Sequence, residues 1–374
     1  MLKILYAGSP APAATTLRLL LEKCSQGQNG ANENGSQGQN AAASGGCSQD
    51  QNGASQNGSQ DQKGGGWQIA GVLTNPPSAK GRHKELVPTD VGLLAQERGI
   101  PVFCPQKLDT AARDQIAAQG FDALVCFAYG KIFGPKFLSL FKAGGVNVHP
   151  SLLPKYRGAT PVPAAILNCD TESGVTVQTL ALGMDEGEIL AQEVIALDGT
   201  ETTDSLLDKS AQIAAALLQS LLDKAAQNPG AEILKKGRAQ EGEPSYTKTI
   251  SKDDALINWN DSAVKIAAAV RAYTSEPGSW TRIGGESGET LKILKAAPLG
   301  LADDCGSQAQ NAAAPSGQSS VPGTVAAFDK KQGILIKCGQ GVLCVTELQR
   351  QQKKAMGYKD FMNGARDFVG TRLV

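Results

Sequence analysis

The sequence predicts an α/β protein in two parts, an N-terminal domain with a parallel-rich sheet covered by helices and a small C-terminal β-barrel. Strand and helix signals alternate through the first part, a rhythm typical of parallel strands joined by crossover helices. In the second part, five short strand signals follow a single helix, which is typical of a small barrel. The length of 374 residues is enough to bury both cores.

The first part, residues 1–228, begins with an apolar strand at 2–7, a Gly-Ser-Pro turn and an amphipathic helix to about Lys23. Further strands are expected at 67–74, 101–104, 123–127, 146–148, 174–181 and 188–197. Further helices are expected at 88–98, 111–118, 131–141 and 203–224. Thr203 or Asp204 lies near the N-cap of the last helix. In such a sheet, ligands bind at the carboxyl ends of the strands.

The second part, residues 246–374, follows a polar and basic linker at 229–245. A helix is expected at 262–273. The strands are expected at 279–283, 290–296, 323–328, 333–338 and 341–348.

Two low-complexity insertions, at 24–66 and 302–320, interrupt these patterns. Gly, Gln, Asn and Ser fill 32 of the 43 positions of the first insertion, which has too little apolar surface to offset the entropy cost of ordering. The whole chain carries no net charge, but the 312 residues outside the insertions hold 35 basic and 31 acidic groups. A nucleic-acid partner would therefore be bound by a local basic patch.

The eight cysteines include no CxxC pair, so we expect buried, reduced thiols and no structural metal. The N-terminus enters a strand directly, and no apolar run approaches the roughly 20 residues of a membrane helix. We expect a cytoplasmic protein that does not bind a membrane.

The chain has only two histidines, His83 and His149. His149 stands at the carboxyl end of an apolar strand, and strand alternation places Asn147 on the same side. Asp185, in a glycine-bracketed turn, is the best candidate for a carboxylate that orients the imidazole. A role as an Asx-turn residue is equally compatible with the sequence. Spacing also leaves Glu186 and Glu188 open.

Three segments carry a family resemblance: Asn147-Val-His149, the loop at 151–158 and Met184-Asp-Glu-Gly187. Together they resemble the signature of the 10-formyltetrahydrofolate-dependent formyltransferases. This signature is shared by glycinamide ribonucleotide formyltransferase, an aminoarabinose-pathway formyl transfer domain and formyltetrahydrofolate hydrolase domains.

Further segments resemble the methionyl-tRNA formyltransferase family in particular. They are a basic loop at 74–88, the run 246–252 with Ile257-Asn-Trp259, and a C-terminal stretch at 349–354, 360–364 and 370–373. Without the insertions, the resemblance covers nearly the whole chain. Departures include Pro76-Pro77 in the basic loop and a Glu after Asp185 where Thr is common.

The resemblance implies a Rossmann-like formyltransferase domain followed by an OB-like tRNA-binding domain, acting as a monomer. The activity implied is transfer of a formyl group from 10-formyltetrahydrofolate, without a metal, to methionine on initiator methionyl-tRNA. Asn147, His149 and Asp185 would be catalytic, and the donor would bind at Ser151, Leu152, Leu153 and Pro154. The candidates for tRNA contacts are Lys80, Arg82, His83, Lys84, Lys235, Lys236, Arg238, Lys353 and Lys354, with Arg82 the best single one.

Three alternatives remain open from the sequence. The protein could hydrolyse 10-formyltetrahydrofolate, with water in place of the amine, or it could formylate another amine. It could also be a tRNA-binding module without catalysis, although the complete set of Asn147, His149 and Asp185 argues against that.

Overall fold

The computed structural model describes residues 1–29, 66–80, 85–228, 230–274, 276–299 and 321–374. Most of both predicted insertions therefore lies outside the described residues. The helix α1 (Ala11–Asn29) continues six residues beyond Lys23, into the first of these stretches.

The N-terminal part is built on a seven-stranded sheet with the order β10-β9-β7-β6-β1-β2-β5. Its strands are β1 (Leu2–Gly8), β2 (Trp67–Leu73), β5 (Val102–Phe103), β6 (Ala123–Phe127), β7 (Gly144–His149), β9 (Glu172–Thr179) and β10 (Ile189–Ala196). The first five strands run parallel to one another, whereas β9 is antiparallel to both β7 and β10. The predicted parallel-rich sheet is confirmed.

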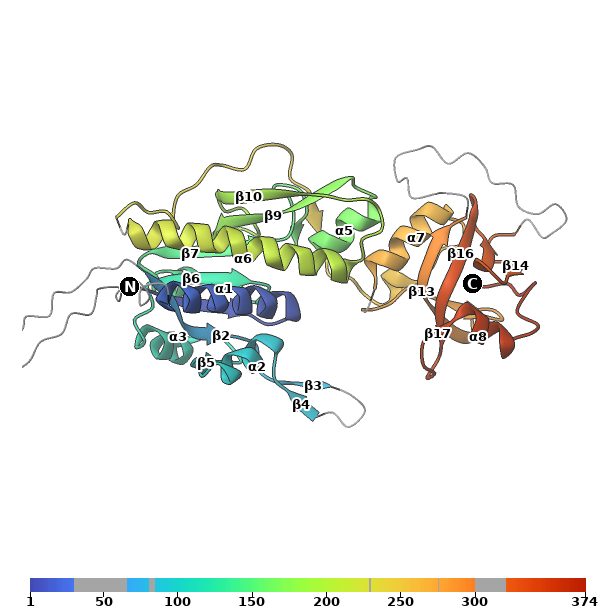
Figure 1. The fold of residues 1–374 in the computed structure, drawn as a ribbon, viewed down its shortest axis with the longest axis horizontal. Helices are drawn as coiled ribbons and strands as arrows, with labels where there is room; N and C mark the ends of the chain where they lie inside the picture. The colour runs from blue at the N-terminus through green and yellow to red at the C-terminus, as the bar shows by residue number, and fades with distance from the viewer. Residues whose placement is uncertain (30–65, 81–84, 229, 275, 300–320) are drawn as a thin grey trace, which may run out of the picture.

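Helices cover both faces of this sheet because its strands are apolar on both sides. In β1, Ile4 and Tyr6 enter one core and Leu5 and Ala7 enter the other. The first core lies under α1 and α6 (Thr203–Gln227), which Figure 1 shows side by side across the sheet. α2 (Asp90–Glu97) and α5 (Pro161–Leu167) pack on the same side, and α3 (Thr110–Ala117) and α4 (Pro135–Leu138) on the other.

Two helix predictions need correction. The helix expected at 131–141 is only α4, because Pro135 has no backbone N–H to donate and therefore starts a helix instead of continuing one. The N-cap of α6 is Thr202, whose side chain accepts from Ser205 N in a reciprocal capping box.

The basic loop at 74–88 contains two short strands, β3 (Ser78–Lys80) and β4 (Glu85–Val87), that pair with each other.

The C-terminal part is an antiparallel sheet of β12 (Trp280–Ile283), β13 (Glu289–Pro298), β16 (Val342–Arg350), β15 (Gly333–Lys337) and β14 (Val325–Asp329), with β17 (Met356–Gly357) beside β16. The chain end joins its two edges: Arg282 N donates to Val374 O, and Val325 N donates to Thr371 O. The helix α8 (Tyr358–Asn363) packs on β16 and β17. This closed arrangement confirms the OB-like β-barrel.

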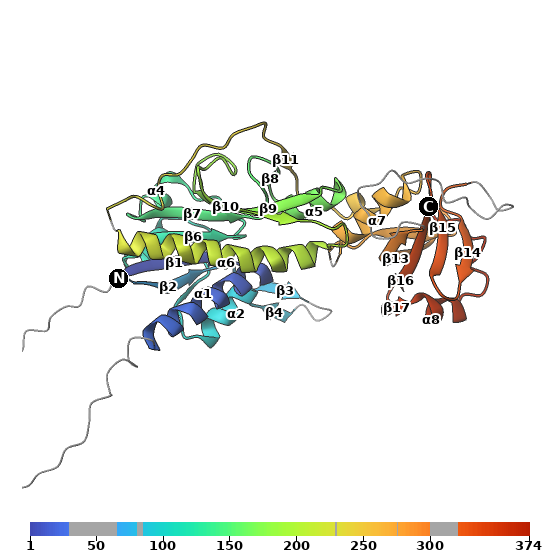
Figure 2. The ribbon, with the colours of Figure 1, turned by 45° about the horizontal axis from the view of Figure 1, so that its top comes forward.

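Helix α7 (Ala263–Ala272) connects the two parts (Figure 1). It contributes to the barrel core through Ile266 and Val270, and it also packs on α5. Thr203 Oγ1 at the start of α6 donates to Ala272 O. Before α7, β11 (Tyr246–Thr247) pairs with β8 (Arg157–Gly158), and a 3-10 turn spans Asp253–Ala255 (Figure 2).

Cys126, Cys338 and Cys344 are buried, and Cys169 is partly exposed. Cys104 is exposed, contrary to the expectation, because it follows the two-residue edge strand β5. In the described part of the chain, no helix is long and apolar enough to cross a membrane, and no cluster of side chains is suited to hold a metal ion.

Candidate active site

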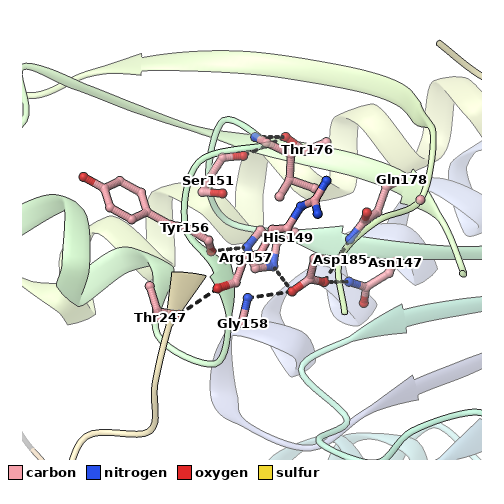
Figure 3. A network of polar contacts seen from close by, with 12 residues as sticks. Asn147, His149, Ser151, Tyr156, Arg157, Gly158, Thr176, Gln178, Asp185 and Thr247 are labelled. Carbon is pink, nitrogen blue, oxygen red and sulfur yellow. Dashed lines mark hydrogen bonds and ion pairs between the residues drawn. The ribbon is translucent and has the colours of Figure 1, made fainter. Parts of the chain in front are cut away.

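Strand β7 brings two polar side chains to the carboxyl end of the sheet. Val146 and Val148 point into the core under α1 and α6, so Asn147 and His149 take the alternate positions. The turn between β9 and β10 carries Asp185, which meets both of them (Figure 3). The structure therefore brings together the three residues that the sequence singled out.

The Asp185 carboxylate is surrounded by donors. Its Oδ1 accepts from Gln178 Nε2 at 2.9 Å and from Asn147 Nδ2 at 3.4 Å. Its Oδ2 accepts from Gly158 N at 2.8 Å and lies 3.6 Å from His149 Nδ1. All these partners lie outside its own turn, so the Asx-turn interpretation does not describe this carboxylate.

The two neighbouring carboxylates face elsewhere. Glu186 pairs with Arg157 at 3.4 Å, and Glu188 accepts from Gly237 N at 2.8 Å. Among the three carboxylates that spacing left open, the structure places Asp185 against His149.

His149 is buried, with 4% of its surface exposed. Burial lowers its pKa, while the Asp185 carboxylate and the hydrogen bond to the Tyr156 carbonyl act in the opposite direction. Nε2–H donates to Tyr156 O at 2.8 Å, which leaves Nδ1 of the neutral ring facing Asp185. A proton taken up at Nδ1 would therefore be stabilised by the carboxylate.

The loop at 151–154 lies beside this centre and is held by hydrogen bonds to Lys155 and to β9. Ser151 Oγ donates to Lys155 O at 2.6 Å, and Leu153 N donates to Thr176 Oγ1 at 3.3 Å. Ser151 and Leu153 are buried, whereas Leu152 and Pro154 are partly exposed. The loop leads into Tyr156, so its geometry sets the carbonyl that contacts His149.

A small, open depression adjoins the cluster. It is lined by Asn147, Gln178, Thr179, Leu180, Ala181, Gly183, Asp185, Glu186 and Gly187. Amide and carboxylate groups lie next to apolar side chains here, a combination suited to a flat group with polar edges.

Comparisons with known proteins identify the family of this chain. The family model described as "Formyl transferase" matches residues 42–222, and the model described as "Formyl transferase, C-terminal domain" matches residues 249–366. The methionyl-tRNA formyltransferase of Treponema denticola is 41% identical over 312 residues, which cover 81% of this chain and 91% of the relative. That of Geobacter metallireducens is 32% identical over 309 residues, covering 82% of this chain and 91% of the relative.

The chain belongs to the methionyl-tRNA formyltransferase family. Among solved structures, the sugar 3N-formyl transferase WlaRD, crystallised with dTDP and 5-N-formyl-THF, aligns with a TM-score of 0.51 at 18% identity. The alignment covers 95% of this chain and 99% of WlaRD, which supports the shared fold. The predicted family is confirmed.

The candidate tRNA contacts of this formyltransferase are spread over distant surfaces. Arg82, His83 and Lys84 lie outside the described residues, and so does the side chain of Lys80 at the end of β3. Lys353 and Lys354 are exposed in the turn between β16 and β17.

The three candidates in the linker lie in two places. Lys235 packs beside Gly144 at the amino end of β7, the opposite end of that strand from His149, and Lys236 is exposed next to it. Arg238 donates to Gln192 on β10. The structure thus does not bring Lys235 and Lys236 near the three proposed catalytic residues.

Sequence reasoning missed three partners in this formyltransferase site: Gln178, Gln240 and the backbone N–H of Gly158. Gln178 lies opposite Asn147 in the β7–β9 register, so only the strand pairing reveals that the two side chains share one carboxylate. Gln240 lies 55 residues from Asp185 in the chain, and no local pattern could have identified it.

Proposed function

We propose that the protein transfers the formyl group of 10-formyltetrahydrofolate to the α-amino group of methionine on initiator methionyl-tRNA, for translation initiation in the cytoplasm. The observation that carries the proposal is the Asn147–His149–Asp185 cluster, with His149 buried and the other two partly exposed, in a chain of this family. The complete cluster argues against a tRNA-binding module without catalysis.

The reaction needs stabilisation of an oxyanion. When the neutral amine attacks the formyl carbon, a C–N bond forms and the formyl oxygen becomes negative in a tetrahedral intermediate. Asn147 uses one amide hydrogen toward Asp185, which leaves the second free to donate to this oxygen. One such preorganised donor is worth about 3 kcal/mol in the transition state.

The reaction also moves one proton from the attacking amine to N10 of the folate, whose bond to the formyl carbon breaks. Burial lowers the pKa of His149, so at neutral pH its ring is a neutral acceptor. Nδ1 takes the amine proton and returns it to N10. In the interval, the Asp185 carboxylate at 3.6 Å stabilises the imidazolium.

We place the folate donor beside Asn147, where Gln178 and Asp185 can meet the polar edges of a pterin and Leu180 its face. The loop Ser151, Leu152, Leu153 and Pro154 supports this site from the side through its two partly exposed residues. For the tRNA, the residues proposed to contact phosphates are Lys80, Arg82, His83, Lys84, Lys235, Lys236, Lys353 and Lys354.

A single assay tests the function. Purified protein is mixed with initiator methionyl-tRNA and 10-formyltetrahydrofolate that carries a labelled formyl group. The expected product is labelled formyl-methionyl-tRNA. Release of labelled formate with unlabelled tRNA would instead identify a hydrolase, and tRNA binding without turnover would identify a binding module.

A further inference from the structure

The segment that joins α6 to α7 passes directly over the catalytic cluster. We call residues 230–245 the connecting segment. It forms a bridge with β10 through Arg238 and Ile189, whose backbone groups exchange two hydrogen bonds. Farther along, Ser245 Oγ accepts from Tyr156 N at 2.8 Å, next to the carbonyl that contacts His149. Figure 2 shows this segment leading into β11, beside β8.

Gln240 is the residue of the connecting segment that reaches the Asp185 turn. Its Nε2 donates to Asp185 O at 2.7 Å and to Gly187 O at 2.8 Å, with a longer bond of 3.4 Å to Gln178 Oε1. Its Oε1 accepts from Arg157 Nη2 at 2.8 Å and from Arg157 Nε at 3.2 Å. Both ends of the amide are therefore used, so the side chain has one orientation that satisfies all of its partners.

The turn that Gln240 holds has little freedom of its own. Asp185 has a φ of +52°, in the left-handed region that non-glycine residues rarely occupy. A Cβ on Gly187 would lie 1.8 Å from Thr179 O, so the turn sits against the end of β9 without space for a side chain. Gln240 donates to the carbonyls of both Asp185 and Gly187, and so attaches this constrained turn to the connecting segment.

The contact between Asp185 and His149 depends on the position of this turn. Asp185 Oδ2 lies 3.6 Å from His149 Nδ1, beyond hydrogen-bond range, so a small outward rotation of the turn would remove the carboxylate from the imidazole. The hydrogen bonds from Gln178 and Gly158 hold the carboxylate end, while Gln240 holds the backbone from which it projects.

We propose that Gln240 is a positioning residue for the catalytic pair. It holds the Asp185 turn against His149, so that the connecting segment is part of the active centre as well as a link between the two parts of the chain. The kinetic consequence rests on the proposed function, but the structural consequence can be measured without any turnover.

Besides Asp185, few charged or titratable groups near His149 could change its pKa. Asp185 is the one in contact with its ring among the described residues. Arg157 and Glu186 neutralise each other at the side of the turn, and the Tyr156 phenol pairs with Asp170. On the neighbouring strand β6, burial raises the pKa of Cys126 to about 12, so this thiol is uncharged at neutral pH.

Two near-isosteric variants separate the functions of the amide. Gln240→Met removes all five hydrogen bonds, whereas Gln240→Glu keeps the acceptor for Arg157 but loses the donations to the turn and to Gln178. The matched control is Glu241→Gln, at the exposed neighbouring position. Circular dichroism and thermal unfolding would check that each variant folds.

The first readout is the titration of His149 by NMR, in which a His83→Gln background leaves His149 as the single histidine. Because Asp185 raises the pKa of His149, its retreat should lower the midpoint by at least about half a pH unit in Gln240→Met. Glu241→Gln should leave the midpoint unchanged. An unchanged midpoint in folded Gln240→Met overturns the proposal.

The second readout is formyl transfer to methionyl-tRNA. In both Gln240 variants kcat should fall by at least about tenfold, with KM for tRNA within about twofold of wild type. Wild-type kcat in Gln240→Glu would show that only the bond to Arg157 matters, and would also refute the assignment. If the wild-type protein itself transfers no formyl group, the proposed function fails while the NMR result still decides the role of Gln240.

Discussion

Replacing Asp185 by Asn removes one charge from the catalytic cluster while keeping the shape of the side chain. Two unit charges 3.6 Å apart attract each other by about 4 to 5 kcal/mol at an effective dielectric constant of about 20. The donors that share this carboxylate reduce that value. We therefore expect the formylation rate to fall by at least about 10²-fold, since a protonated His149 loses its partner.

The substitution Asp185→Asn also introduces an NH₂ group where Gln178, Asn147 and Gly158 already donate hydrogen bonds. The carboxylate accepts from Gln178, Asn147 and Gly158, so the new NH₂ must meet N–H donors on either side. If it turns toward His149 it can donate to the unprotonated Nδ1, but the Gly158 N–H then loses its acceptor. One buried donor left without an acceptor costs about 1 to 3 kcal/mol, which should appear as a lower free energy of unfolding.

Single-turnover formylation at saturating donor, measured between pH 6 and 9, separates the chemical step from binding. The control is Glu193→Gln, an exposed carboxylate on β10 that should leave the rate within about twofold. Filter binding should give unchanged affinity for tRNA. If Asp185→Asn retains a rate within about threefold of wild type, the assignment of Asp185 to His149 is wrong.

Four further predictions follow from the same geometry. Asn147→Ala should lower kcat by about 10²- to 10³-fold with little effect on the binding of folate, and a small loss of kcat would exclude Asn147 as the oxyanion donor. Arg82→Ala should raise KM for tRNA and reduce the salt dependence of tRNA binding without changing folate affinity, and equal losses for both ligands would contradict a phosphate contact. Burial lowers the pKa of His149, so as the pH falls through about 6.5 the unfolded chain binds a proton that the folded chain does not, and the stability drops. His149→Gln should therefore lose less free energy of unfolding between about pH 7.5 and 5.5 than the wild-type protein does. Equal losses in the two proteins would show that His149 is not titrating as a buried base. Gly187→Ala should lower both the unfolding temperature and kcat, since its Cβ would meet Thr179 O, whereas Gly134→Ala, with nothing near the added Cβ, should do neither.

The amino-acid sequence by itself determined the architecture and most of the proposed catalytic set. Alternating strand and helix signals predicted the parallel-rich sheet, because the period of apolar residues is a local property that survives without knowledge of the fold. The position of Asn147 and His149 at the end of an apolar strand predicted their common side for the same reason. The family signature pointed to formyl transfer.

Tertiary structure decided what spacing alone left open. Spacing favoured Asp185 but left Glu186 and Glu188 open, and only the fold of the β9–β10 turn places Asp185 against His149. The pairing of Gln178 with Asn147 depends on strand register, and the reach of Gln240 depends on the path of the connecting segment. The closure of the barrel by residues 370–374 is of the same kind. Such contacts join residues far apart in the chain, and no local periodicity encodes them, because they exist only once both elements have packed.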